Sequence, residues 1–518
     1  MIRVLDPTTA VVRAGQPAPL PTVYVADRLL VRGDQAWNGL DPRVRGRLEE
    51  LGWELAPLAQ PRRRGRYDVR AKLESVRPVA HELRARNDRP GPPPDAWTLL
   101  QELAAAAPEL AACFELDHVL TAAGGGYWGG IGGGYWGGIG GGYWGGIGGG
   151  YWGGIGGGYW GGIGAPGPAE FGMPGYGGRT PVALVVADPS RTAPRLKRPP
   201  VVVMPDTGIG KHPWFPRERT GELRRLPAAF APASRPVTVH GSPVPDESSG
   251  VSAPLTGDLD RLAGHGTFIA GIVRQTCPAA RLEAHAVMSS AGVMLEDELL
   301  DLLHDLLERQ LQALAGGDPA RVVDVLSLSV GYYHEQPEDA LSDTSVASVL
   351  RDLGQVGVLV VAGAGNDATD RKFLPAGFAG QVTGLERDAL PLLSVGSLNP
   401  SPGTVSLFSN AGKWVTTYRP GAAIVSTLPV SEDAAGQAST LAAAGTPDER
   451  RRGTIDRDDF SGGFGVWSGT SFAAPVLSGQ LAQALVELGP DEAGLEALLE
   501  RGWQAVERVL DDPAVRRP

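Results

Sequence analysis

Apolar runs alternate with helical patterns over the C-terminal three-fifths of the chain. The runs cover residues 200–204, 321–328, 357–361 and 390–395, and helical periodicity fills 266–275, 295–314 and 345–353. Continuous apolar strands that alternate with helices indicate a parallel sheet covered on both faces. We therefore predict an α/β domain, a doubly wound parallel sheet with helices on both faces, over residues 199–505, followed by a C-terminal tail at 506–518.

The pattern before this region predicts a smaller α+β domain at residues 1–123. Residues 22–31 are typical of a strand, and residues 47–55 and 96–107 are typical of amphipathic helices. Asp95 is a suitable N-cap for the second helix, which should stop at Pro108. Residues 164–198 hold another strand-like run, 181–188, and a Pro-rich linker. The strands before and after residues 124–163 would then belong to one N-terminal domain that this segment interrupts.

The interruption is a repeat. Residues 124–163 are five consecutive copies of Gly-Gly-Gly-Tyr-Trp-Gly-Gly-Ile, so 25 of the 73 glycines lie there. Three interpretations stay open. In the first, the repeat is a flexible linker, although pure linkers favour Ser and lack Tyr-Trp-Ile. It is a segment for binding or self-association through spaced aromatic rings. Or it is a protease substrate, since its glycines leave an exposed and easily extended backbone.

Charge and composition narrow the function classes. The 518 residues carry 47 Lys and Arg against 58 Asp and Glu, a net charge of −11. This balance argues against nucleic-acid and anionic-membrane partners, which are held mainly by positive charge. Two cysteines, Cys113 and Cys277, exclude a disulfide framework and a four-thiolate zinc site. No apolar signal region or membrane span is seen, so we expect a cytoplasmic protein, with non-standard export left open.

Four polar motifs carry the candidate chemistry. Asp206 follows the first apolar run in VVVMPDTGIG, and Asn366 ends another in VAGAGN. His265 in GHGTFIAGIV and Ser471 in SGTSFAAP each open an apolar helix. In open parallel sheets, ligands bind beyond the carboxyl ends of the strands. We therefore expect these four residues to meet at one edge of the sheet.

Together these residue types meet the requirements of a serine nucleophile. Asp206 can orient one imidazole nitrogen of His265, and the other nitrogen can take the proton of Ser471. The amide of Asn366 and the backbone N–H of Ser471 can stabilise a developing oxyanion. Each motif alone could have a purely structural role, such as a turn or a helix cap. Their combination and order favour catalysis.

The order Asp…His…Ser, with DTG, GHGT and GTSFAAP as written, resembles the subtilisin-like serine proteases (subtilases, peptidase family S8) over residues 199–490. The resemblance implies a subtilisin-like fold and a serine endopeptidase that cuts protein or peptide substrates through an acyl-enzyme. It makes Asp206, His265 and Ser471 the catalytic triad and Asn366 the oxyanion-hole side chain.

The resemblance also implies two substrate-binding segments. One would offer backbone to an extended substrate strand: Ser329, Val330 and Gly331. The other would line the pocket for the residue before the cut: Ala362, Gly363, Ala364 and Gly365. Small residues there leave space for a bulky apolar side chain. Asp367–Ala368 departs from the family pattern, in which a small residue and glycine are usual, and 430–460 is expected to be an inserted loop.

Regulation and cofactors follow from the same resemblance. Subtilisin-like proteases commonly carry an N-terminal propeptide that blocks the cleft until it is cut. Residues 1–123 are in the right place for such an intramolecular inhibitor, removed by self-processing, or for a permanent regulatory domain. No cofactor is required; members of the family often bind calcium, for which this sequence assigns no ligands. The competing hypothesis is a catalytically silent scaffold whose Tyr-Trp-Gly repeat mediates binding or self-association.

Overall fold

The computed structural model describes most of the chain outside the octapeptide repeat. The described ranges are residues 1–122, 179–216, 234–248, 259–336, 344–433 and 440–511, less short gaps at 14–15, 34–35, 37–38, 60–64, 70–71, 89–90, 381–385, 402, 442–450, 453–455, 457 and 490–493. The repeat at 124–163 lies outside them, as do 164–178, most of the expected 430–460 loop and residues 512–518.

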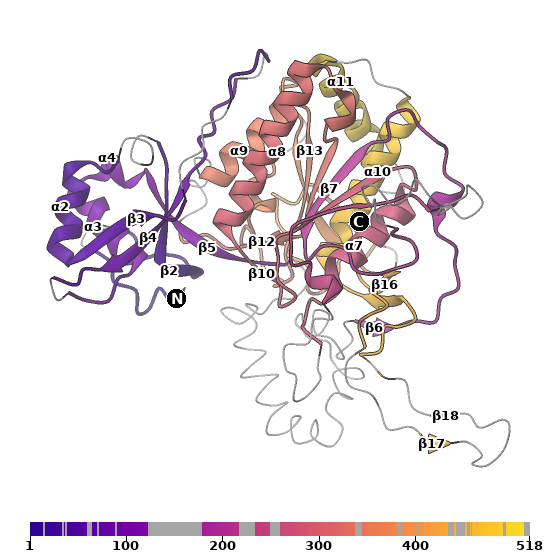
Figure 1. The fold of residues 1–518 in the computed structure, drawn as a ribbon, viewed down its shortest axis with the longest axis horizontal. Helices are drawn as coiled ribbons and strands as arrows, with labels where there is room; N and C mark the ends of the chain where they lie inside the picture. The colour runs from indigo at the N-terminus through magenta and orange to yellow at the C-terminus, as the bar shows by residue number, and fades with distance from the viewer. Residues whose placement is uncertain are drawn as a thin grey trace.

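A parallel seven-stranded sheet forms the centre of the large domain, which begins near residue 199 (Figure 1). Its order is β15-β14-β13-β11-β7-β9-β8, and every neighbouring pair is parallel. The strands are β7 Val201–Asp206, β8 Thr238–His240, β9 Arg281–Ala286, β11 Val325–Leu328, β13 Leu359–Gly363, β14 Leu392–Leu398 and β15 Thr417–Pro420. The predicted parallel α/β architecture is confirmed.

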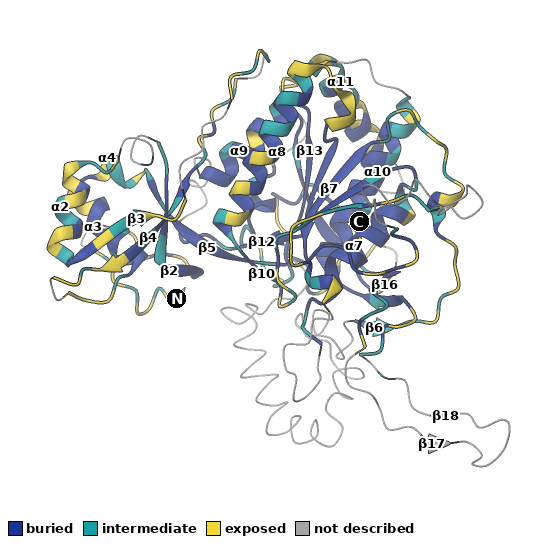
Figure 2. Ribbon diagram, viewed as in Figure 1, coloured by how far each residue is buried: buried dark blue, intermediate teal, exposed yellow. Residues whose placement is uncertain are grey.

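Helices cover both faces of this sheet (Figure 1). They are α7 His265–Thr276, α8 Glu296–Gly316, α9 Ser345–Gln355, α10 Thr470–Leu488 and α11 Leu495–Leu510. Helices α8 and α9 pack together on one side, while α10 contacts α7, α11 and the central strands on the other. Figure 2 shows the strands buried and the exposed residues on the outer helix faces. This sandwich of apolar strands between two helical layers is the main core.

The N-terminal domain, residues 1–122, is an antiparallel sheet with helices on one side (Figure 1). Its elements are β1 Ile2–Leu5, β2 Thr22–Val31, α2 Pro42–Leu51, β3 Trp53–Pro57, β4 Val79–Ala85, α3 Ala96–Ala106, α4 Pro108–Ala111 and β5 Phe114–Ala122. The strand predicted at 22–31 and the helix capped by Asp95 are present, and the Asp95 carboxylate accepts from the Thr98 N–H. This domain has its own apolar core.

The helix predicted at 47–55 is partly wrong. Gly52 ends α2 in the left-handed conformation, with φ 74°, and Trp53 begins β3. The apolar spacing across this point continues the helical period, so only the glycine marks the change. The Trp53 indole is buried and donates to the carbonyl of Pro92 at 2.8 Å.

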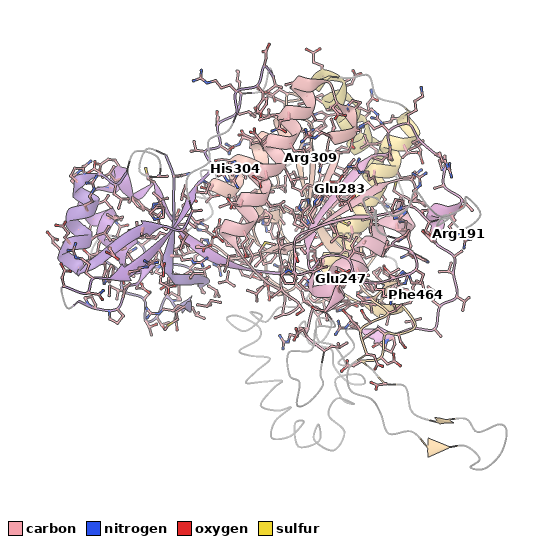
Figure 3. All side chains as sticks on the ribbon, in the orientation of Figure 1. Arg191, Glu247, Glu283, His304, Arg309 and Phe464 are labelled. Atoms are coloured by element: carbon pink, nitrogen blue, oxygen red, sulfur yellow. The ribbon has the colours of Figure 1, made fainter. Side chains whose placement is uncertain are left out.

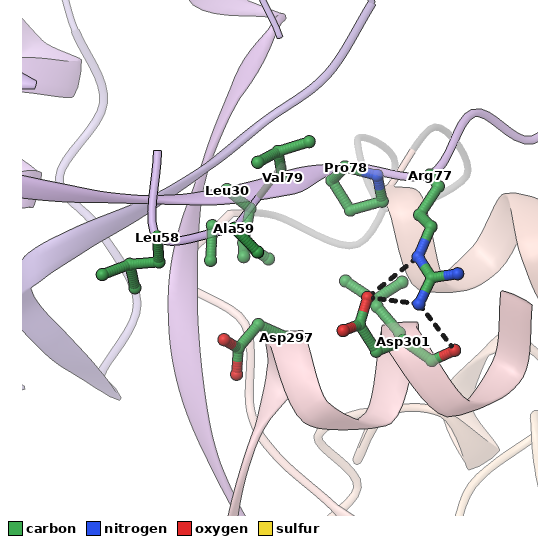
Figure 4. Close-up of a pocket in the computed structure, with 10 residues that line it drawn as sticks. Leu30, Leu58, Ala59, Arg77, Pro78, Val79, Asp297 and Asp301 are labelled. Atoms are coloured by element: carbon green, nitrogen blue, oxygen red, sulfur yellow. Dashed lines mark hydrogen bonds and ion pairs between the residues drawn. The ribbon is translucent and has the colours of Figure 1, made fainter. Parts of the chain in front are cut away.

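The two domains share one sheet. Strand β5 of the N-terminal domain pairs antiparallel with β10 (Val293–Leu295) on one side, and its last residues pair with β12 (Val330–Gly331), both from the large domain. Arg77, two residues before β4, forms ion pairs with Asp301 and Asp305 of α8. Figure 4 shows the small cavity beside this contact, about 120 Å³ in volume. The N-terminal domain is therefore docked along the large domain.

The chain after the repeat differs from the prediction. The expected strand at 181–188 is reduced to β6, Thr180–Pro181, which pairs with β19 (Phe464–Trp467) and not with the N-terminal sheet. Beyond it, residues 182–188 pair with no strand in the described part of the chain, and Val185 is fully exposed. The remaining short elements are β16 Ile424–Thr427, β17 Thr440–Leu441, β18 Arg451–Arg452 and the 3₁₀ turns Pro189–Arg191, Pro245–Glu247, Pro319–Arg321 and Ala376–Phe378. Within the described ranges, no helix is long and apolar enough to cross a membrane.

Candidate active site

The carboxyl end of β7 holds Asp206. Its side chain is buried, and its Oδ1 accepts from the backbone N–H of Thr207 at 2.8 Å and from the Thr207 hydroxyl at 3.2 Å. The strand VVVM before it is buried on both faces, which fixes where the carboxylate emerges. The residue thus lies at the edge where the sequence places it.

His265 opens α7 directly beside this carboxylate. Its Nδ1 donates to Asp206 Oδ1 at 2.8 Å and lies 3.0 Å from Oδ2. The preceding Gly264 has φ 80° and turns the chain into the helix. A carboxylate on Nδ1 leaves the lone pair of Nε2 available to accept a proton. That nitrogen is buried and has no hydrogen-bond partner among the residues that the structure describes.

A second carboxylate supports this helix start. Asp246, in a loop between β8 and α7, accepts from the N–H groups of Gly264 and Thr267 and from the Thr267 hydroxyl at 2.6 Å. Burial raises the pKa of Asp246 to about 6, and the bonds to Thr267 oppose that rise. Sequence reasoning missed this residue, because nothing in its Pro-rich surroundings links it to a turn 18 positions later.

Ser471 lies in the first turn of α10. Its hydroxyl donates to the carbonyl oxygen of Ser329 at 3.2 Å, and the Ser329 hydroxyl donates back to the Ser471 carbonyl at 2.9 Å. The rings of Trp467 and Phe472 lie 5.6 and 5.4 Å from the His265 ring. Ser471, His265 and Asp206 are all buried. The hydroxyl is thus bonded to Ser329 and not to His265 in this arrangement.

Asn366 follows β13 and is tied to the same helix. Its Oδ1 accepts from the backbone N–H of Thr470 at 2.9 Å, and the Thr470 hydroxyl accepts from the N–H of Gly365 at 3.0 Å. The other polar atom of the amide, Nδ2, can only donate hydrogen bonds. The structure therefore brings Asn366 to the helix N-terminus that carries Ser471.

The first predicted substrate segment, Ser329–Gly331, lies against β5. Val330 is paired with Ala122 and Gly331 with Thr121 in antiparallel register. The Ala122 N–H also donates to the carbonyl of Gly292, just before β10, at 3.3 Å. A strand of the N-terminal domain therefore lies between two strand edges of the large domain, next to Ser471.

The second predicted segment, Ala362–Gly365, ends β13 and leads into Asn366. Gly365 has φ 98°, and a Cβ there would lie 2.4 Å from Asn410 Nδ2, so only glycine fits. Ala368 also has a positive φ, 52°. Alanine here adopts the left-handed conformation for which the family pattern uses glycine.

Beyond the predicted residues, Glu432 and Arg179 lie buried beside the His265 turn. Arg179 Nη1 is 3.7 Å from Glu432, and its guanidinium lies over the rings of Phe460 and Trp467. Burial raises the pKa of Glu432 to about 8, although Arg179 opposes the rise. Nothing in the sequence links Arg179 to Glu432, because the two residues lie about 250 positions apart.

Comparison with known proteins agrees with this geometry. The model of the subtilase family matches residues 199–496, more than half of the chain. A search of curated proteins finds no match. The matched range contains the parallel sheet together with Asp206, His265, Asn366 and Ser471. The chain belongs to the subtilase family of serine peptidases.

Proposed function

We propose that this protein is a serine endopeptidase in which Asp206, His265 and Ser471 are the catalytic residues. The observation that carries the proposal is the contact of His265 Nδ1 with both oxygens of Asp206, at 2.8 and 3.0 Å. That contact fixes the ring so that Nε2 is the basic nitrogen, and the carboxylate stabilises the imidazolium that forms when it is protonated.

The reaction begins with a rotation of the Ser471 side chain from the Ser329 carbonyl to His265. Nε2 takes the hydroxyl proton while the oxygen bonds to the substrate carbonyl carbon. The negative oxygen receives hydrogen bonds from Asn366 Nδ2 and from the N–H of Ser471 at the start of α10. His265 then gives the proton to the leaving amine, and water hydrolyses the acyl-enzyme by the same route.

We further propose that the N-terminal domain is an intramolecular inhibitor that the enzyme removes itself. Strand β5 supports this, because it uses the backbone of Val330–Gly331 in the way an extended substrate would. While β5 is bound, another peptide cannot pair with the same strand edges. Cutting after β5 would release the domain from its covalent link to the large domain.

The test is intact-mass spectrometry with and without a fluorophosphonate, on wild type, Ser471→Ala and Ser478→Ala. Ser478 is the matched control, because it is another buried serine of α10 and is bonded to Ser327. We expect a shortened, singly labelled chain for wild type and Ser478→Ala, and a full-length, unlabelled chain for Ser471→Ala. Two results together would contradict the proposal and favour a silent scaffold: wild type stays full-length and unlabelled, and the wild-type chain without residues 1–198 also stays unlabelled.

A further inference from the structure

A buried cluster lies where β5 docks on the large domain. His118 comes from β5, and His334 and Glu335 come from the segment after β12. Their side chains are 1, 6 and 4 % exposed. His118 Nε2 is 2.7 Å from Glu335 Oε2, and His334 Nδ1 is 3.3 Å from the same oxygen. One ligand atom from each residue lies within 4.8 Å of the other two.

We propose that His118, His334 and Glu335 form a zinc site that joins the N-terminal domain to the large domain. Imidazole and carboxylate ligands lie about 2.0–2.2 Å from zinc, so two ligands of a tetrahedral ion are ~3.3 Å apart. The separation of 3.3 Å between His334 and Glu335 equals this value, and the separation of 2.7 Å between His118 and Glu335 would lengthen on binding. Two imidazoles among three ligands favour zinc over calcium or magnesium, which take oxygen ligands.

The surroundings hold the ligands in the required state. His118 Nδ1 donates to Glu296 Oε2 at 2.5 Å, and the Tyr332 hydroxyl donates to the other oxygen of Glu296 at 2.9 Å. A carboxylate on the far ring nitrogen orients a histidine ligand and makes it more basic. His334 Nδ1 accepts from the N–H of Gln336 at 3.1 Å, so this nitrogen carries the lone pair, and zinc binding would replace that hydrogen bond.

Charge also favours a divalent cation. Glu296 and Glu335 are buried carboxylates, and both are bonded to the imidazole of His118. Among the described residues, no Lys or Arg side chain forms an ion pair with either carboxylate. The guanidinium of Arg371 contacts the carbonyl of His334, not these carboxylates. A divalent cation would therefore offset the negative charge of these two buried carboxylates.

A second cluster of the same composition provides the matched control. His240, Glu283 and His285 also lie within 4.8 Å of one another. The oxygens of Glu283, however, already bind Arg281 and Arg309, with Arg309 Nη1 at 2.5 Å (Figure 3). His240 is 45 % exposed. With its carboxylate neutralised by two guanidinium groups, this cluster lacks the excess negative charge that attracts a cation.

The test uses the full-length Ser471→Ala chain, so that both domains stay linked. After incubation with ZnCl₂ and desalting, metal analysis should find one zinc per chain. The same ratio is expected in His240→Ala, whereas His118→Ala and His334→Ala should lose the metal. Tyr332→Phe should weaken the affinity by roughly 10–100-fold, because it loosens Glu296. Thermal melting of each variant checks that it is folded.

Cobalt gives the second readout. Co²⁺ in place of zinc should show the visible absorption of a tetrahedral ion in the parent chain and in His240→Ala. Absence of zinc and of this spectrum from the folded parent chain would overturn the proposal and leave the cluster as a set of hydrogen-bonded side chains. Equal metal content in the parent, His118→Ala and His334→Ala would overturn it as well. Since neither readout involves Ser471, failure here is distinguishable from failure of the proposed activity.

Discussion

Gly266, the residue after His265, is a position where one added methyl group should disable the enzyme. A Cβ there would lie 2.2 Å from the carbonyl oxygen of Gly208, 3.0 Å from the Gly208 nitrogen and 3.1 Å from the Thr207 hydroxyl. Carbon and oxygen atoms normally approach to about 3.3 Å at closest. Gly208 belongs to the turn that follows Asp206, so Gly266→Ala must separate the two backbones by ~1 Å.

The separation acts directly on the contact between His265 and Asp206. A misplacement of 1 Å can cost about 100-fold in rate, equivalent to ~2.7 kcal/mol of activation free energy. Overpacking of a buried backbone contact should also lower the free energy of unfolding by about 1–3 kcal/mol. The assay is kcat of the processed enzyme on a fluorogenic peptide, with thermal unfolding measured in parallel.

Gly316→Ala is the control for this experiment. Gly316 ends α8, and a Cβ there would meet nothing within 4 Å. We expect wild-type kcat and an unchanged or slightly higher melting temperature, since alanine favours the helix. A Gly266→Ala enzyme that keeps kcat within about threefold of wild type would refute the argument that this close approach positions His265.

Three further predictions concern single side chains. Asn366→Asp keeps the acceptor for the Thr470 N–H but removes the Nδ2 donor, so kcat should fall by about 10²–10³ with little change in KM; a loss under tenfold in steady-state kinetics would contradict the assigned role. Ala368→Gly removes a side chain at φ 52° and should raise the free energy of unfolding in urea by ~0.5–1 kcal/mol; no gain would mean that the turn is unstrained. Because the pKa of Glu432 is raised to about 8, its contribution to stability is full below its ordinary value and is lost as pH rises through 8. The free energy of unfolding, measured in urea between pH 5 and 9, should therefore fall less steeply with pH for Glu432→Gln than for wild type. Parallel plots of this free energy against pH would show that Glu432 is ionised throughout.

The parallel sheet and the polar residues at the carboxyl ends of its strands could be predicted from the sequence, for a physical reason. Parallel strands that are buried on both faces are continuous apolar runs in the sequence. The motifs at their carboxyl ends must meet at the same edge of the sheet. Asp206, His265 and Asn366 could be placed in this way before any contact was known. The local period was misleading at Trp53, where one glycine ends a helix within a continuing apolar pattern.

What could not be predicted depends on distant pairing. Asp246 reaches the turn before His265 from a loop with no periodicity, and β6 pairs with β19 across almost 300 residues. The docking of β5 between β10 and β12 requires the tertiary arrangement of both domains. Such contacts leave no local pattern, because each segment alone looks like an ordinary loop or strand.

The register of β5 leads to a last prediction, the position of the self-processing cut. Thr121 pairs with Gly331 and Ala122 with Val330. Counting on by one position from these pairs leads to Ser329, whose carbonyl oxygen accepts from the Ser471 hydroxyl. The bond presented to Ser471 should therefore be the one between Ala123 and Gly124, and processing would leave the repeat on the large domain.

An inserted residue distinguishes this explanation from recognition of the repeat itself. With one alanine added directly after Ala122, strand register keeps the cut at the first residue beyond β5, so the released N-terminal fragment has its wild-type mass. If the glycines beginning at Gly124 direct the cut, the fragment becomes one alanine heavier. Intact-mass spectrometry separates the two outcomes, and the heavier fragment would refute selection by register. Backbone pairing on both edges of β5 allows one register and therefore one cut. Recognition of the repeat, which offers identical glycines at eight-residue intervals, would instead give a series of fragments that differ by eight residues.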